Sequence, residues 1–341
     1  MKSLNAFARL SAAFGFENSQ VLPEILAYLM SEAEAETILR LPGTPPSVAE
    51  KMSRPVGDVA AELHDLFLRG LVFIGESTSV GPHYQLTDAG RFMDSVLFDP
   101  RSERFGQPYL ELWKQFAHKE LWPATGHVPW NFRVLPVGEA VPSGSRVMPH
   151  EEAAQIVSRA RRIAVQQCPC RKRERNCDNP LETCLSLDGL ADYVLYRQAG
   201  REIDVEEALA ILRLCEELGL IHQTVNTDRT DVICNCCGCC CGILTPLLTH
   251  GMHEATAKSR FRATVDPALC IDCLECVERC LFGALQAADG RLKPMPDRCF
   301  GCGQCVTLCP AGAITLTEVR DPDHIPAGTP GFDLSRVPAE S

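Results

Sequence analysis

The chain reads Cys270-Ile-Asp-Cys273-Leu-Glu-Cys276-Val-Glu-Arg-Cys280, and it repeats this spacing at Cys299-Phe-Gly-Cys302-Gly-Gln-Cys305-Val-Thr-Leu-Cys309-Pro310. In such a run, three cysteines bind one [4Fe–4S] cluster and the fourth reaches the neighbouring cluster. The spacing predicts that Cys270, Cys273, Cys276 and Cys309 hold the first cluster. It predicts that Cys299, Cys302, Cys305 and Cys280 hold the second. Zinc is the alternative, although zinc prefers two pairs of ligands to a doubled run of four.

The repeat extends beyond the cysteines. An offset of 29 residues, from Cys270 to Cys299, also pairs glycine with glycine and alanine with alanine further along the chain. The pairs are Pro267 with Pro296, Gly283 with Gly312, and Ala284 with Ala313.

With these motifs, residues 264–318 resemble the bacterial two-cluster ferredoxin family. The resemblance implies a pseudo-symmetric β-α-β, β-α-β fold and two clusters close enough for fast electron transfer. Leu281 stands where that family usually has proline, which puts the local turn in question.

A second field of ten cysteines lies in the middle of the chain. Its members are Cys168, Cys170, Cys177, Cys184, Cys234, Cys236, Cys237, Cys239, Cys240 and Cys241. Adjacent cysteines point in different directions, so the second run cannot place all its thiols on one metal. We therefore expect members of both runs to share at least one further iron–sulfur cluster. The spacing assigns no individual ligand.

Two alternatives stay open for this field. Four of the thiols could hold a structural zinc ion. A dithiol/disulfide pair could instead lie beside a cluster, because Cys168-Pro169-Cys170 resembles a motif of the ferredoxin–thioredoxin reductase family. That resemblance covers three residues only.

The segment between the two cysteine runs shows helical patterns. Asp204 and Glu207 form a capping-box pattern before a helix on which Cys215 falls at a buried position. Cys215 is thus interpreted as a buried apolar residue rather than a ligand. Upstream, residues 159–175 contain seven cations and one acid. These cations suit either the surroundings of an anionic cluster or an ordinary solvated surface.

Residues 20–98 resemble winged helix-turn-helix domains. We expect helices over 20–40, 47–53, 56–69 and 88–97, and wing strands over 70–74 and 84–86 with a tip at 75–81. Across 42–98 there are four cations and seven acids, a net charge of −3. DNA affinity rests largely on neutralised phosphates, so this balance favours protein docking or homodimerisation over DNA binding.

The whole chain has 341 residues, 19 cysteines and a net charge of −11. The start of the chain shows no secretory signal, and many thiols are clustered, so we expect the protein in a reducing cytoplasm. No apolar run is long enough for a membrane span. The expected fold class is α+β and multidomain. The expected parts are a winged-helix-like domain (1–98), an irregular connector (99–150), a helical cysteine-rich domain (151–260), a two-cluster ferredoxin-like domain (261–318) and a loose tail (319–341).

No nucleotide-binding, flavin or hydrolase motif is visible in the sequence, so no catalytic residue is predicted. The sequence predicts an iron–sulfur protein that passes single electrons to a redox partner protein in anaerobic metabolism. One alternative is a ferredoxin-coupled reductase with redox-active cysteines in the middle domain. Another is a winged-helix transcriptional regulator that senses redox state.

Overall fold

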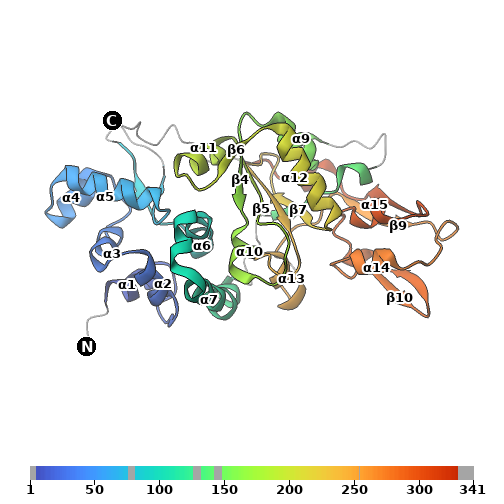
Figure 1. Ribbon diagram of the computed structural model, residues 1–341, viewed down its shortest axis with the longest axis horizontal. Coiled ribbons are helices and arrows are strands. Elements are labelled where there is room, and N and C mark those ends of the chain that lie inside the picture. Colours follow the sequence, from blue (N-terminus) through green and yellow to red (C-terminus); the bar gives the residue numbers. More distant parts are fainter. Residues whose placement is uncertain (1–4, 76–80, 126–131, 142–147, 253, 329–341) are drawn as a thin grey trace.

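The computed structural model of the protein describes residues 5–75, 81–125, 132–141, 148–252 and 254–328. Three parts follow one another along its longest axis (Figure 1). Helices of the N-terminal part form one end, a six-stranded sheet lies in the middle, and the C-terminal cysteine repeat forms the other end.

The N-terminal part begins with three short helices, α1 (Ala6–Ala13), α2 (Leu22–Leu29) and α3 (Glu32–Ile38). The single helix expected over 20–40 is therefore wrong. Ser31 interrupts it, because its hydroxyl accepts from the Glu34 N–H while the Glu34 carboxylate accepts from the Ser31 N–H. This capping box starts a new helix where the apolar pattern alone continues.

The elements that follow are α4 (Pro45–Met52), α5 (Val56–Leu68), β1 (Phe73–Ile74), β2 (Tyr84–Gln85) and α6 (Ala89–Phe98). β1 and β2 pair antiparallel, and helix α5 buries one apolar face. These elements lie where the sequence placed them, and the assignment to winged-helix domains stays a prediction. Most of the expected wing tip, 76–80, lies outside the described residues.

The connector predicted to be irregular is largely helical. It contains the 3₁₀ turn Pro100–Phe105, α7 (Gly106–Phe116), the π-helical turn Ala117–Leu121 and α8 (Trp122–Thr125). Tyr109, Leu110, Trp113 and Phe116 form the buried face of α7. The frequent prolines obscured this pattern, but Pro108 lies in the first turn of α7, where a missing N–H costs no helical hydrogen bond.

The middle domain also differs from the prediction, because a sheet rather than a set of helices forms its centre. The strands are β3 (Phe132–Val134), β4 (Ile163–Gln167), β5 (Glu182–Leu187), β6 (Arg201–Ile203), β7 (Ile221–Val225) and β8 (Val232–Cys236). Their order is β3-β7-β8-β5-β4-β6, and all neighbours are antiparallel. β4 and β7 are almost wholly buried, so they lack the alternation of apolar and polar residues that marks a half-exposed strand.

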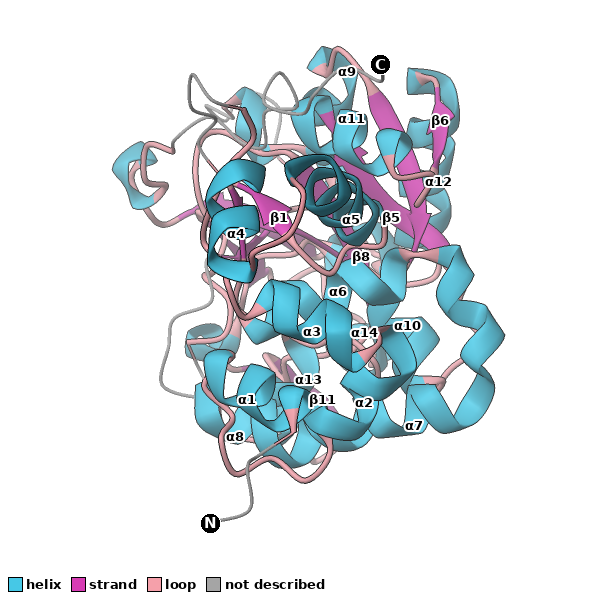
Figure 2. Ribbon diagram, turned by 90° about the vertical axis from the view of Figure 1, so that its left-hand side faces the viewer, coloured by secondary structure: helices cyan, strands magenta, loops and turns pink. Residues whose placement is uncertain are grey.

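Five helices pack around this sheet. They are α9 (Ala153–Arg159), α10 (Pro169–Glu174), α11 (Asp188–Tyr196), α12 (Val205–Glu217) and α13 (Leu244–Thr249). Asp204 caps α12 by accepting from the Glu207 N–H at 2.8 Å, as its sequence predicts. Seen from the N-terminal end, the helices of that part lie in front of the sheet (Figure 2). Helix α10 contacts both α6 and α7, so the N-terminal part packs on the cysteine-rich domain.

The C-terminal repeat folds as two matching half-units. The first contains β9 (Phe261–Val265), α14 (Glu275–Arg279) and β10 (Leu285–Ala288), and the second contains β11 (Arg291–Pro294), α15 (Gln304–Leu308) and β12 (Ile314–Glu318). β9 pairs with β12 and β10 pairs with β11, both antiparallel. The turns after Cys280 and Cys309 are alike, since Gly283 and Gly312 donate to their carbonyls at 3.3 and 3.2 Å. Leu281 therefore leaves the local turn unchanged.

Part of the tail expected to be loose is packed on the protein. Arg320 donates to the Ser259 carbonyl at 2.6 Å, His324 Nε2 lies 3.0 Å from the Lys258 carbonyl, and Ile325 is buried. The polar and proline-rich composition hid these few anchoring contacts. Residues 329–341 lie outside the described part of the chain.

A buried ion network fastens the cysteine repeat to the middle domain. Arg260, fully buried at the start of the repeat, lies 3.0 Å from Glu151 and 2.7 Å from Glu318. Glu151 belongs to a 3₁₀ turn before α9, and Glu318 ends β12. Burial raises the pKa of Glu151, although hydrogen bonding and Arg260 oppose this effect.

Replacing Arg260 should weaken the attachment. Arg260→Ala leaves the buried Glu151 carboxylate without its closest cation, so we expect a loss of about 3–5 kcal/mol in unfolding free energy. Anaerobic urea unfolding, followed by far-UV circular dichroism, measures this loss. Arg291→Ala removes an exposed arginine of the same repeat and serves as the matched control. Equal unfolding midpoints for the two variants would contradict the interpretation.

Candidate iron–sulfur and metal centres

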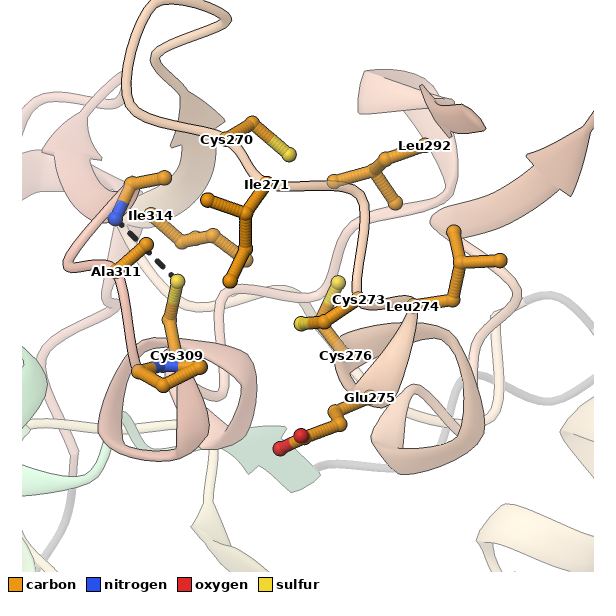
Figure 3. Close-up of a pocket in the computed structure, with 12 residues that line it drawn as sticks. Cys270, Ile271, Cys273, Leu274, Glu275, Cys276, Leu292, Cys309, Ala311 and Ile314 are labelled. Atoms are coloured by element: carbon orange, nitrogen blue, oxygen red, sulfur yellow. Dashed lines mark hydrogen bonds between the residues drawn. The ribbon is translucent and has the colours of Figure 1, made fainter. Parts of the chain in front are cut away.

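The four cysteines predicted for the first cluster line one pocket at the outer end of the repeat. Cys270 and Cys273 come from the loop before α14, Cys276 from α14 itself, and Cys309 from the end of α15 in the other half-unit. Figure 3 shows these side chains around a shared space. The Ala313 N–H donates to Cys309 Sγ at 3.3 Å, and Ile271, Leu292 and Ile314 supply an apolar wall.

The set predicted for the second cluster follows the same construction. The Ala284 N–H donates to Cys280 Sγ at 3.3 Å, which reproduces the Ala313 contact after 29 residues. Cys299 Sγ accepts from the N–H groups of Ala263 and Gly301 at 3.4 and 3.3 Å. Amide donors of this kind stabilise the negative charge of cluster sulfur and raise its reduction potential.

Electrostatic interactions cross between the half-units in both sets. Cys309 interacts with Cys276 of the first half, and Cys280 interacts with Cys302 and Cys305 of the second. Burial raises the pKa of Cys276 to about 11 and that of Cys302 to about 12. Only thiolates bind iron, so cluster binding must displace protons from these groups. The arrangement fits two four-thiolate clusters, and their ligand assignment remains a prediction.

In the middle field, the structure separates the ten cysteines into a group of four and a group of six. The group of four contains Cys177, Cys237, Cys239 and Cys240, whose Sγ atoms all lie within 4.8 Å of one another. Cys177 follows α10, and the other three form the turn immediately after β8. Cys240 is fully buried, whereas Cys239 is exposed.

The group of six contains Cys168, Cys170, Cys184, Cys234, Cys236 and Cys241. Their thiols interact in a continuous chain that runs Cys168, Cys170, Cys241, Cys236, Cys234 and Cys184. Neighbouring strands β5 and β8 contribute Cys184, Cys234 and Cys236. The Gly242 N–H donates to Cys170 Sγ at 3.3 Å, and a Cβ at Gly242 would lie 3.6 Å from that sulfur.

Buried cations accompany these thiols. Arg171 and Arg173 of α10 are both about 2% exposed, so this part of the basic run is not a solvated surface. Arg171 donates to the Thr183 hydroxyl at 2.9 Å and to the carbonyls of Pro180 and Asn235. These acceptors are neutral. Burial acts to lower the pKa of Arg171, but the charges of nearby thiolates, Cys168 and Cys237 first, raise it.

The Cys170 thiol is the most acidic of the group of six. A hydrogen bond from Cys168 lowers the pKa of Cys170, and Cys241 and the charge of Arg173 act in the same direction. In the group of four, a hydrogen bond from Cys240 lowers the pKa of Cys237 to about 5. Cys237 is thus a thiolate able to bind a metal at neutral pH.

Cys215 lies outside both groups. It is fully buried on α12, where it packs with Leu220, Cys237 and Cys240. This position agrees with its interpretation as a buried apolar residue. Burial raises its pKa to about 12, which keeps the thiol protonated.

Asp94 of α6 lies beside the group of six and was not predicted from the sequence. Burial raises the pKa of Asp94 to about 8, the charge of Cys170 adds to this shift, and Arg173 opposes it. Asp94 therefore holds a proton at neutral pH beside the group of six. Its place in the sequence gives no sign of this role, because 76 residues separate it from Cys170.

Comparison with known proteins gives one match. Residues 256–314 match the family model of the 4Fe-4S dicluster domain, which covers the C-terminal repeat. The C-terminal part is therefore ferredoxin-like and of a kind that binds [4Fe–4S] clusters. No curated protein and no solved structure matches the chain. In the described residues, no helix combines the length and apolar character needed to cross a membrane.

Single substitutions should separate the two ferredoxin sets. Cys273→Ala removes an exposed thiol of the first set, so we expect loss of about four iron and four sulfide per chain, with the second cluster retained. Iron and sulfide analysis with electron paramagnetic resonance of the reduced protein measures this. Cys302→Ala is the matched variant for the second set. Loss of both clusters from a folded Cys273→Ala protein would contradict independent ligand sets.

If the group of six holds a cluster, Asp94 should couple protons to its reduction. Reduction adds negative charge near Asp94 and strengthens its hold on the proton, so protonation favours reduction. We expect the midpoint potential to fall by up to about 59 mV per pH unit as the pH rises through about 8. Potentiometric titration across pH 6–10, with Asp94→Asn as the comparison, measures this slope. The same slope in Asp94→Asn would assign the proton to another group.

Proposed function

We propose that this protein is a single-electron carrier in which two [4Fe–4S] clusters of the C-terminal domain and at least one further cluster of the middle domain form a relay. The proposal rests on one observation above all. Residues within the second ferredoxin set contact the rest of the protein at Val137 and Leu220, while Cys273 of the first set is exposed to solvent. Electrons can therefore pass in either direction between a surface site and the protein interior.

Several contacts support the inner position of the second set. The Cys302 carbonyl accepts from the Val137 N–H at 2.9 Å, and Gln304 donates to the Leu220 carbonyl at 2.9 Å. Phe300 packs in the same apolar core as Cys236 and Cys241. Leu281 follows Cys280 and lies against the turn at 237–240, which holds three cysteines of the group of four. A Cβ atom at Gly238 of this turn would lie 3.6 Å from the Leu281 methyl carbons.

The first set supplies the surface contact. Cys273 is exposed, and the neighbouring Leu269 and Ile271 expose 52% and 65% of their surface. Exposed acids, among them Glu275 and Glu278, accompany these apolar side chains. Such a surface suits transient docking of a redox protein that carries a basic patch around an apolar centre.

The N-terminal domain fits a protein-docking role better than DNA binding. The cations nearest to helix α5 already have carboxylate partners: Arg54 lies 2.6 Å from Glu62, and Arg69 lies 2.8 Å from Asp65. Paired cations are poorly placed to neutralise phosphates. The regulator hypothesis requires sequence-specific DNA binding that changes with cluster state. A gel-shift titration at low salt that shows no DNA binding would contradict this hypothesis.

One observation keeps the reductase alternative as a second candidate. Cys239 is an exposed thiol within the middle field, where a substrate disulfide could reach it. That function requires thiols of the anaerobically reduced holoprotein to react with iodoacetamide. Complete resistance of all ten middle thiols would contradict it.

Metal analysis of the anaerobically purified chain tests the relay. We expect about twelve or more iron per chain with matching sulfide, because two ferredoxin clusters alone account for about eight. Reductive titration should then take up one electron per cluster. About eight iron and eight sulfide would restrict electron transfer to the C-terminal domain, and absence of sulfide would overturn the proposal.

A further inference from the structure

The group of four has closer sulfur spacing than the other cysteine sets. Cys177 Sγ lies 3.7 Å from both Cys237 Sγ and Cys240 Sγ, and Cys239 Sγ lies 3.7 Å from Cys240 Sγ. All four sulfur atoms fall within 4.8 Å of one another. The four thiols are thus compact, with three sulfur–sulfur distances of 3.7 Å and the other three no longer than 4.8 Å.

This spacing matches the coordination sphere of one metal ion. Zinc–thiolate bonds are about 2.3 Å long, and the edge of a tetrahedron is about 1.63 times the distance from centre to corner, which gives a sulfur–sulfur distance of about 3.8 Å. The 3.7 Å distances need no rearrangement to reach this value.

A [4Fe–4S] cluster requires wider spacing. Each of its four thiolates binds a different iron at a corner of the cube and points away from the other three. The ferredoxin sets provide an internal comparison: within the described residues, neither set brings three sulfur atoms within 4.8 Å of one another. The group of four is therefore too compact for a cube, while the ferredoxin sets leave room for one.

The surroundings are those of a structural site, with Cys239 on its exposed side. Cys215, Leu220 and Ile211 pack around Cys237 and Cys240. The Asn179 amide donates to Cys177 Sγ at 3.3 Å, and the Asn176 amide donates to the Cys239 carbonyl at 2.9 Å. Four protein ligands leave no open position for substrate, as in structural zinc sites. These neighbouring donors hold the ligands in orientation.

We propose that Cys177, Cys237, Cys239 and Cys240 bind a single tetrahedral divalent metal ion, zinc in the native protein, separate from every iron–sulfur cluster. The ion replaces the thiol protons, which pass to solvent, and no electron is transferred. The resulting four-thiolate complex carries two negative charges, and the buried Arg171 guanidinium interacts with its Cys237 ligand. The six remaining middle cysteines are then the ligand pool for the further cluster.

The site has a mechanical role in this arrangement. It joins the segment after α10 to the turn after β8, which are 60 residues apart at Cys177 and Cys237. Cys236 and Cys241 of the group of six flank the same turn. Metal binding in the group of four therefore fixes the position of two thiols in the group of six.

The test compares metal contents of three full-length variants purified anaerobically. Cys239→Ala removes an exposed ligand of the group of four, Cys184→Ala removes a thiol of the group of six, and Cys215→Ala removes a neighbouring buried thiol outside both groups. Zinc, iron and sulfide are measured in each variant, and circular dichroism verifies that each is folded. Cobalt-grown protein provides a second readout, because four-thiolate Co²⁺ has characteristic tetrahedral d–d absorption bands.

We expect about one zinc per chain in the parent protein, loss of that zinc in Cys239→Ala, and its retention in Cys184→Ala and Cys215→Ala. The cobalt bands should disappear in Cys239→Ala only. One iron ion without sulfide at this site would support a mononuclear metal site, with iron rather than zinc as the bound metal. Joint loss of iron and sulfide in folded Cys239→Ala, with zinc absent from the parent, would overturn the proposal. This outcome would contradict the zinc site and leave the electron-relay proposal intact. Absence of sulfide from the parent protein would contradict the electron-relay proposal and leave the zinc site intact.

Discussion

The Arg171 guanidinium lies buried between two groups of thiols, and the middle domain is organised around its charge. It interacts electrostatically with Cys168 and Cys236 of one group and with Cys237 of the other. Burying a cation without a counter-charge costs folding free energy, and so does burying a set of thiolates. Placing the two together lowers the cost of burying each. The short helix α10 carries Arg171 between Cys170 and Arg173, and the N-terminal helices α6 and α7 cover it. These helices therefore help to exclude water from the centre.

The C-terminal domain was predictable because three cysteines of each predicted ligand set are close together in the chain. A three-residue spacing within one short helix and its preceding loop determines where three thiols point, and the 29-residue offset repeats that geometry. Positive φ angles recur at equivalent places, at Asp272 and Leu274 in one half and at Gly301 and Gly303 in the other. The sequence signal and the fold therefore carry the same periodicity, and the match to the dicluster family agrees with both.

The middle domain was not predictable in the same way, because its geometry depends on contacts between distant segments. β4 and β7 are buried almost throughout, and β7 buries the polar residues His222, Gln223 and Thr224, so neither strand shows the alternation of apolar and polar residues that marks a half-exposed strand. The division of the second cysteine run depends on a turn at 237–240 that sends Cys239 and Cys240 to one side and leaves Cys236 and Cys241 with the other group. Spacing alone does not encode that division, which also requires Cys177 to approach from 60 residues away.

The predicted exchange of the fourth cysteine between the half-units has a consequence for biosynthesis. The inner ligand set runs from Cys280 to Cys305, whereas the outer set begins at Cys270 and ends at Cys309. A ribosome therefore releases the last inner ligand before the last outer one, and neither half-unit can complete a cluster on its own. With the predicted ligand sets, maturation is a property of the whole repeat. A chain truncated after α15 (Gln304–Leu308) would keep every cysteine of the second set and lack Cys309 of the first.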